Sequence, residues 1–260
     1  MFGQFFVGRI NIFTSLFFIA ILTLIHKEVW AFKLSPMIVE FSPEGSGATQ
    51  TLIVENPDVE KVVLEMEVFE RHIDENGKEL RKETADFTIY PDSLELGAKE
   101  KRNIRLTWIG NKKPNHELSF RFVVSQLPVN TVKPKKENAQ SDLKFLLQYV
   151  ASLYVLPLEA KAEVELINFQ LNLQHPSKQL EIVLQNKGTA HQILTGASLQ
   201  LNGKDTQGKN VSLEIPAKSL KIFDAENLLA LSKRKFKIPL ESHFPLNKLE
   251  KAKIQFAQPE

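Results

Sequence analysis

The segment SDLKFLLQYVASLYVLP, from Ser141 to Pro157, alternates apolar and polar residues with a period of two. Its odd-numbered positions form an unbroken apolar face: Leu143, Phe145, Leu147, Tyr149, Ala151, Leu153 and Val155. The even-numbered positions are polar at first and become apolar at Val150 and Tyr154. Alternation of aromatic and β-branched residues favours a strand over a helix. We therefore expect one long strand, with its first half buried on one face and its second half buried on both.

The chain from Phe32 onward shows the same alternation in TQTLIVEN, KVVLEMEVFER, KRNIRLTWIG and LSFRFVVSQLP. Turn-forming residues separate these segments at intervals typical of an antiparallel sandwich. The clearest turn is Asn76-Gly77, because both residue types tolerate a positive φ. The fold class predicted from this pattern is all-β.

Two domains are expected, over residues 32–157 and 158–260. The alternation restarts after Pro157 in AEVELINFQLNLQ, KQLEIVLQN, HQILTGASLQLNG, VSLEIPAKSLKIF and KRKFKIPLE. Within the first domain, just before the long strand, the lysine-rich segment TVKPKKENAQS has no apolar face and is expected to be a solvated loop. The chain has no cysteine, so its stability must come from packed cores, and its length suffices for two domains of about a hundred residues each.

Residues 1–31 have the features of a secretory signal. Arg9 precedes an apolar stretch from Ile10 to Ile25, and the tripeptide Val29-Trp30-Ala31 occupies the positions that a signal peptidase reads. We expect cleavage after Ala31. The alternative is an uncleaved N-terminal anchor, because the apolar stretch is slightly long for a signal and short for a membrane span.

The charge of the exported chain argues against a nucleic-acid partner. Cleavage removes Arg9, Lys27 and Glu28, which lowers the formal net charge from +2 to +1. A nearly neutral protein has little long-range attraction for a polyanion. The thiol-free composition also excludes cysteine chemistry.

The sequence contains no pattern that predicts a metal site, a cofactor or an enzyme. The six histidines stand singly, without the spacing of metal ligands: His26, His72, His116, His175, His191 and His243. Three glutamates alternate along one expected strand, namely Glu65, Glu67 and Glu70, and this is typical of a solvated sheet face. Glycoside chemistry by such carboxylates is a remote alternative. The aromatic residues Trp108, Phe120 and Phe122 are expected to fill a core.

The order of several motifs resembles the periplasmic chaperones of the chaperone–usher pilus pathway (PapD-like), as a divergent member. The first domain has KLSPMIVEF, TIYPDSLELGAKEKRNIRLTW and ELSFRFVVSQLPVN in the family's order, followed by the loop and the long strand. The second domain has LQNKGTAHQIL, which is similar to the family's Asn-x-Gly-x-x-His stretch, and LLALSKRKFKIPLE near its end. This resemblance implies two immunoglobulin-like domains set at an angle.

The resemblance also implies the partners and the location. Pilus-like protein subunits are the expected partners, and an outer-membrane usher is left open as a second. The family is periplasmic and non-enzymatic, so we expect no cofactor, no small-molecule substrate and no membrane-embedded part after signal cleavage. The expected activity is chaperoning in fimbrium biogenesis, within cell wall organisation, by donor strand complementation.

In this mechanism the exposed half of the long strand completes a subunit that lacks a strand. Leu143, Phe145 and Leu147 are the side chains expected to enter the subunit groove, and Tyr149 continues the same face. From Tyr149 onward we favour packing on the chain's own domain. The alternative for the whole face is that it packs only on its own domain.

The sequence departs from the family at a pair of basic residues that grip the subunit's terminal carboxylate. Alignment places Ile38 and Ser152 at these positions, and neither side chain carries a positive charge. We therefore expect an apolar cleft, with recognition resting on the strand face. The competing function is a structural or adhesive surface protein of immunoglobulin-like fold that assembles by strand exchange.

Overall fold

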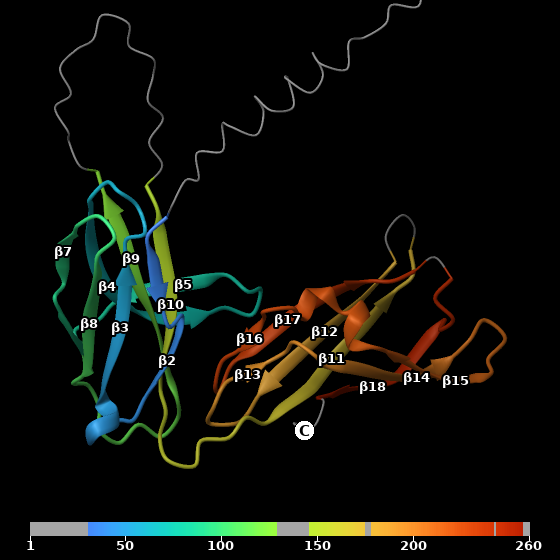
Figure 1. Cartoon of the computed structure of the whole chain (residues 1–260). Coiled ribbons are helices and arrows are strands. Elements are labelled where there is room, and N and C mark those ends of the chain that lie inside the picture. The colour runs from blue at the N-terminus through green and yellow to red at the C-terminus, as the bar shows by residue number, and fades with distance from the viewer. Residues whose placement is uncertain (1–30, 129–145, 175–177, 242, 257–260) are drawn as a thin grey trace, which may run out of the picture.

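The computed structural model describes residues 31–128, 146–174, 178–241 and 243–256, and these residues contain no α-helix (Figure 1). The described strands form two groups, and each group encloses its own hydrophobic core. The all-β prediction is confirmed. Within the described ranges, no helix is long and apolar enough to cross a membrane.

The first group is a sandwich of two sheets. Its elements are β1 (Lys33–Ser35), β2 (Ile38–Phe41), η1 (Ser46–Ala48), β3 (Thr49–Glu55), β4 (Val62–Ile73), β5 (Glu79–Glu83), β6 (Phe87–Tyr90), β7 (Ser93–Leu96), β8 (Lys101–Trp108), β9 (Leu118–Leu127) and β10 (Gln148–Val155). One sheet has the order β1-β3-β8-β6, and the other has the order β2-β10-β9-β4-β5, with β7 also paired to β4. The chain crosses between the two sheets from β1 to β2.

The core of this sandwich follows from the period-two pattern, since alternate residues of each strand point inward. Trp108, Phe120 and Phe122 are buried, as predicted, and the ring of Phe87 meets those of Trp108 and Phe120 edge-on at 5.2 and 5.1 Å. Edge-to-face contacts of this kind add to the stabilisation from burial.

The second group contains β11 (Val164–Asn172), β12 (Gln179–Asn186), β13 (Gln192–Ile193), β14 (Ser198–Lys204), β15 (Asn210–Ile215), η2 (Ala217–Ser219), η3 (Lys221–Phe223), β16 (Asn227–Leu228), β17 (Lys233–Pro239) and β18 (Lys248–Gln255). Its sheets are β11-β12-β17, β15-β14-β18 and the short pair β13-β16. The last strand, KLEKAKIQ, was not among the strands expected from the sequence, because charged residues at half of its positions obscure the alternation.

One buried asparagine has the same role in each group. Nδ2 of Asn56 lies 2.8–3.3 Å from the carbonyl oxygens of Glu60, Leu96 and Gly97. In the second group, the corresponding atom of Asn186 lies within 3.2 Å of three carbonyl oxygens, those of Ala190, Leu228 and Leu229. Both residues are fully buried and end or directly follow a strand. The two groups are thus built alike around an equivalent polar residue, although no sequence repeat is visible.

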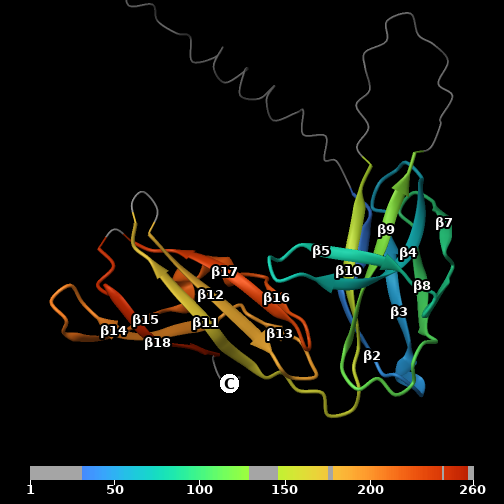
Figure 2. The same ribbon diagram turned by 180° about the vertical axis from the view of Figure 1, so that it is seen from behind.

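The β4–β5 hairpin reaches from the first group to the second (Figures 1 and 2). At its tip, the backbone N–H of Lys235 in β17 donates to the carbonyl of Glu75 at 2.7 Å. Gly77 has a φ of 91°, and a Cβ there would lie 2.6 Å from Nη2 of Arg234. The turn predicted at Asn76-Gly77 therefore needs glycine both for its backbone and for this contact.

Two predictions concern the division of the chain, namely a domain boundary at Pro157 and a signal segment over residues 1–31. The division at Pro157 stays a prediction, although the separate cores agree with two domains. The signal segment, apart from Ala31, lies outside the described residues, and so do the whole lysine-rich segment, Leu143 and Phe145.

Candidate functional site

Strand β10 is paired unequally on its two sides. It pairs antiparallel with β9 from Gln148 to Val155, but it pairs parallel with β2 only from Ser152 to Val155. No described strand pairs with the β2 side of β10 over residues 148–151. Ser152 N–H donates to Met37 O on that side, and alternate amides along a strand point the same way. The backbone groups of Gln148 and Val150 therefore face an open edge, which can accept another strand.

The apolar face beside this edge continues the core of the first group. Ala151, Leu153 and Val155 are fully buried, whereas Leu147 and Tyr149 are partly buried and pack against the same core. The Tyr149 ring meets Phe32 edge-on at 4.7 Å between centroids. The predicted burial of the second half of the strand is confirmed. The proposed insertion of Leu143, Phe145, Leu147 and Tyr149 into a partner stays a prediction.

The two positions aligned with the family's basic pair lie opposite each other in the register of β2 and β10. Ile38 is 62% exposed, and Ser152 is its direct partner. The expectation of an apolar cleft is wrong, because Arg121 of β9 donates from Nη1 to Ser152 Oγ at 2.6 Å. Arg121 is also the register partner of Ser152, so the positive charge comes from the neighbouring strand.

Arg121 belongs to a cluster in which three arginines share one carboxylate. Glu79 Oε2 accepts from Arg121 Nη2 at 2.6 Å and from Arg71 Nε at 2.9 Å. Its Oε1 accepts from Arg81 Nε at 2.8 Å. The cluster therefore carries two more positive than negative charges, which favours an additional anion. Sequence reasoning missed these residues; the available signal was Arg121 itself, a lone charge between the core residues Phe120 and Phe122.

The arginines control the ionisation of Glu79. Burial opposes its charge, but hydrogen bonds from Arg121 and Arg81 and the charges of Arg121 and Arg71 outweigh burial and lower its pKa from 4.5 to about 2. Arg71 is buried, and burial together with the nearby charge of Arg121 lowers its pKa. Glu79 is therefore ionised at neutral pH and neutralises part of the cluster.

The low pKa of Glu79 predicts an acid-dependent loss of stability. The ionised form stabilises the native state above pH 4.5, and this contribution is lost as the pH falls from 4.5 toward about 2. Allowing for partial exposure, we expect it to be about 2 kcal/mol at pH 7. Urea unfolding should show that the wild type exceeds Glu79→Gln in free energy of unfolding, and that this difference shrinks by about half at pH 3. A difference that does not change with pH would contradict the low pKa of Glu79.

A second polar cluster joins the two groups. Tyr154 at the end of β10 is buried, and its Oη accepts from Asn227 Nδ2 of β16 at 2.7 Å. The Tyr154 ring stacks on the His191 ring at 4.2 Å between centroids. His191 Nδ1 lies 2.7 Å from Oε2 of Glu117, whose side chain is fully buried. We call these four residues the joint.

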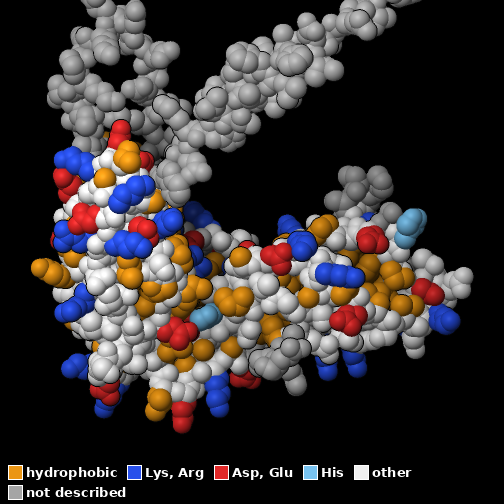
Figure 3. Space-filling model, viewed as in Figure 1, with side chains coloured by type: hydrophobic (Ala, Val, Ile, Leu, Met, Phe, Trp, Pro, Cys, Tyr) orange, Lys and Arg blue, Asp and Glu red, His pale blue; other side chains and the backbone are white. Residues whose placement is uncertain are grey.

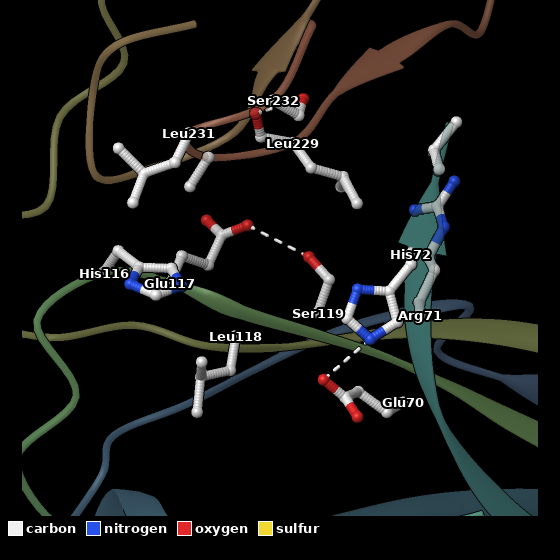
Figure 4. A pocket seen from close by; sticks show the side chains of 12 residues that line it. Glu70, Arg71, His72, His116, Glu117, Leu118, Ser119, Leu229, Leu231 and Ser232 are labelled. Atoms are coloured by element: carbon white, nitrogen blue, oxygen red, sulfur yellow. Dashed lines mark hydrogen bonds and ion pairs between the residues drawn. The ribbon is translucent and has the colours of Figure 1, made fainter. Parts of the chain in front are cut away.

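A pocket of about 230 Å³ opens beside the joint (Figure 4). Glu117 and Ser119 project into it from one side, and Leu229 and Leu231 face them from the second group. His72 pairs with Glu70 at 2.8 Å rather than with another histidine. No group of metal-ligating side chains occurs in the part of the chain that the structure describes.

The Asn-x-Gly-x-x-His stretch of the second group supports the joint. Asn186 Oδ1 accepts from the N–H groups of Glu163 and Gly188 at 3.1 and 3.0 Å. A Cβ on Gly188 would lie 2.3 Å from Lys161 O, so only glycine allows this approach. Asn186 and Gly188 thus hold the loop that presents His191 to Tyr154.

The face of the molecule drawn in Figure 3 does not show a field of one charge sign. Acidic and basic side chains are interspersed on the first group (Figure 3). Glu65 and Glu67 are exposed, as expected for a solvated sheet face. The chemistry of the site is therefore that of a strand edge beside an arginine cluster.

The comparisons with known proteins agree with this architecture. The family described as pili and flagellar-assembly chaperone, PapD N-terminal domain, matches residues 32–161. A chain of the CsuC–CsuE chaperone–tip adhesion subunit complex from Acinetobacter baumannii is 19% identical, with a TM-score of 0.53 over 81% of this chain and 88% of that chain. The class 5 fimbriae chaperone CfaA is 16% identical, with a TM-score of 0.52 over 88% of this chain and 100% of that chain.

The structure of the Salmonella enterica SafA pilin with the SafB chaperone is also similar, with 16% identity and a TM-score of 0.52 over 82% of this chain and 86% of that chain. At these identities the likeness shows the fold, and it confirms the prediction of two immunoglobulin-like domains set at an angle. No curated protein matches the chain by sequence.

Proposed function

This chain belongs to the family of PapD-type pili and flagellar-assembly chaperones, and we propose that it captures incomplete pilus-like subunits by lending them the edge of β10. The observation that carries this proposal is the unpaired side of β10 over residues 148–151. A subunit strand that pairs there gains a backbone ladder, and its apolar groove receives Leu147 and the residues that precede it.

The direction of β2 suggests how the subunit strand runs. The β2 strand is parallel to β10 and begins at Ile38, while the preceding strand β1 lies in the other sheet. A subunit strand that continues the line of β2 along the open edge would end beside Ile38 and Ser152. Its C-terminal carboxylate would then meet Arg121, which replaces the basic pair absent from these positions.

The remaining parts of the proposal follow from the family. The chain acts in the periplasm after cleavage of residues 1–31, and an outer-membrane usher is its second partner. It works as a non-enzymatic binding protein without a cofactor. The structures of the CsuC–CsuE and SafA–SafB complexes support a subunit as the first partner.

Titration calorimetry with a short synthetic peptide of alternating threonine and valine tests whether Arg121 binds a C-terminal carboxylate. The peptide with a free C-terminal carboxylate should bind about tenfold more tightly than its amidated form, a difference of about 1.4 kcal/mol. Arg121→Gln should abolish this difference, whereas Arg105→Gln, an exposed arginine of the other sheet, should preserve it.

Equal affinities of the two peptides for the wild type would refute the carboxylate anchor. Size-exclusion chromatography of the protein alone addresses the competing function. A chaperone is expected as a monomer or small oligomer, and a polymer would indicate a structural protein that assembles by strand exchange.

A further inference from the structure

Arg121 and Arg71 share the carboxylate of Glu79, and Arg121 Nε also lies 3.2 Å from its Oε1. Glu79 Oε2 accepts from Arg121 Nη2 at 2.6 Å and from Arg71 Nε at 2.9 Å. Two guanidinium groups repel each other, and each gains from the same carboxylate, so they compete for it. A change in the hydrogen bonds from one arginine to Glu79 must therefore alter the hydrogen bonds from the other.

The two arginines have different second contacts. Arg121 Nη1 donates to Ser152 Oγ at 2.6 Å, beside the open edge of β10. Arg71 Nη1 lies 3.4 Å from Tyr154 Oη, at the long end of hydrogen-bond distances. Tyr154 Oη also accepts from Asn227 Nδ2 in the second group. A continuous polar path thus runs from the open edge to the joint.

We propose that Glu79 is a positioning residue that couples subunit capture at Arg121 to the contact between the two domains at Tyr154. The binding of a subunit carboxylate to Arg121 rests on the proposed function. The coupling between Arg121 and Tyr154 is a property of the chain itself. The hydrogen bonding of the joint is incomplete, because Asn227 Oδ1 is buried without a hydrogen-bond partner among the described residues.

The direction of the coupling follows from the competition. A carboxylate bound to Arg121 draws this arginine away from Glu79 Oε2, and Glu79 then attracts Arg71 more strongly. Arg71 moves off Tyr154 Oη, so the buried Tyr154 hydroxyl keeps only one of its two donors and is held less firmly. Subunit binding therefore loosens the joint, and by thermodynamic reciprocity a loosened joint favours subunit binding.

Spin labels test the coupling in the free protein, since the chain has no native cysteine. Labels at Thr51→Cys in β3 and Ser212→Cys in β15, both exposed positions, report the distance between the domains. Arg121→Met should broaden the distance distribution, whereas Glu79→Gln should not, because a neutral amide no longer draws Arg71 away from Tyr154 Oη. Arg121→Lys, which keeps the charge but loses the planar fork, is the second variant if Arg121→Met does not fold.

Arg105→Met is the matched control, because Arg105 is an exposed arginine of the other sheet. It should leave the distribution unchanged. If the Arg121→Met variant gives the same distribution as Arg105→Met, the coupling does not exist.

Peptide titration supplies the reciprocal measurement. Tyr154→Phe removes the hydroxyl but keeps the ring stacked on His191, and it should tighten binding of the free-carboxylate peptide about fivefold. In the Arg121→Gln background, Tyr154→Phe should have no effect. An unchanged affinity for the free-carboxylate peptide in Tyr154→Phe overturns the coupling. If no peptide binds the wild type, the proposed function fails, and the spin-label distances alone decide the coupling.

Discussion

Replacing Leu147 by aspartate is expected to lower the affinity for an incomplete subunit at least a hundredfold. Leu147 lies on the apolar face that continues into the core of the first group, next to the open edge. Burying a leucine side chain is worth about 1.5–3 kcal/mol, and a carboxylate in an apolar groove adds a desolvation cost. The loss corresponds to about 2.7 kcal/mol or more. Titration of a subunit that lacks one strand into the purified variant measures it.

Leu146→Asp is the matched control for this experiment. Leu146 is 54% exposed and has the opposite parity along the strand, so its side chain points away from the apolar face. Its replacement should change the affinity little. Because Leu147 also touches the core of its own domain, Leu147→Asp should melt about 2–4 °C lower than the wild type. A variant that unfolds outright, or one that still captures the subunit, would contradict the donor role of Leu147.

Asn186→Ala is expected to cost about 3–5 kcal/mol of unfolding free energy, the largest stability effect that we predict. The side chain is fully buried and makes polar contacts of 2.7–3.2 Å with five backbone groups. Leu229 O would still accept from Ser232 Oγ at 2.7 Å, but alanine would remove the Asn186 contact from each of the other four backbone groups. Each buried group left unsatisfied costs about 1–3 kcal/mol. Water entering the cavity would recover part of this cost.

Urea unfolding followed by circular dichroism measures the effect. Asn210→Ala is the control, because Asn210 is an exposed residue of β15, and it should change stability by about 0.5 kcal/mol or less. Since Asn186 supports the loop that carries His191, the variant should also show two separate unfolding transitions as the domains uncouple. A loss of stability below about 1 kcal/mol would show that the buried groups find other partners.

The sequence by itself determined the fold class and the faces of the strands. Side chains alternate across a strand, so the odd-numbered positions of the segment Ser141–Pro157 reveal which residues enter the core, without any knowledge of the partner strand. Ala151, Leu153 and Val155 are buried for this reason. The same rule fails for β18, where charged residues occupy half of the positions and hide the period.

Only the tertiary structure decided the charge of the cleft and the composition of the joint. Ile38 and Ser152 are register partners, but the expectation of an apolar cleft is wrong because Arg121 donates to Ser152 Oγ. Arg121 reaches Ser152 from 31 positions earlier in the sequence, and Glu79 is 42 positions from Arg121. Such contacts depend on which strands become neighbours and in what register. That choice minimises the free energy of the whole sandwich, so the local pattern of any one strand cannot reveal it.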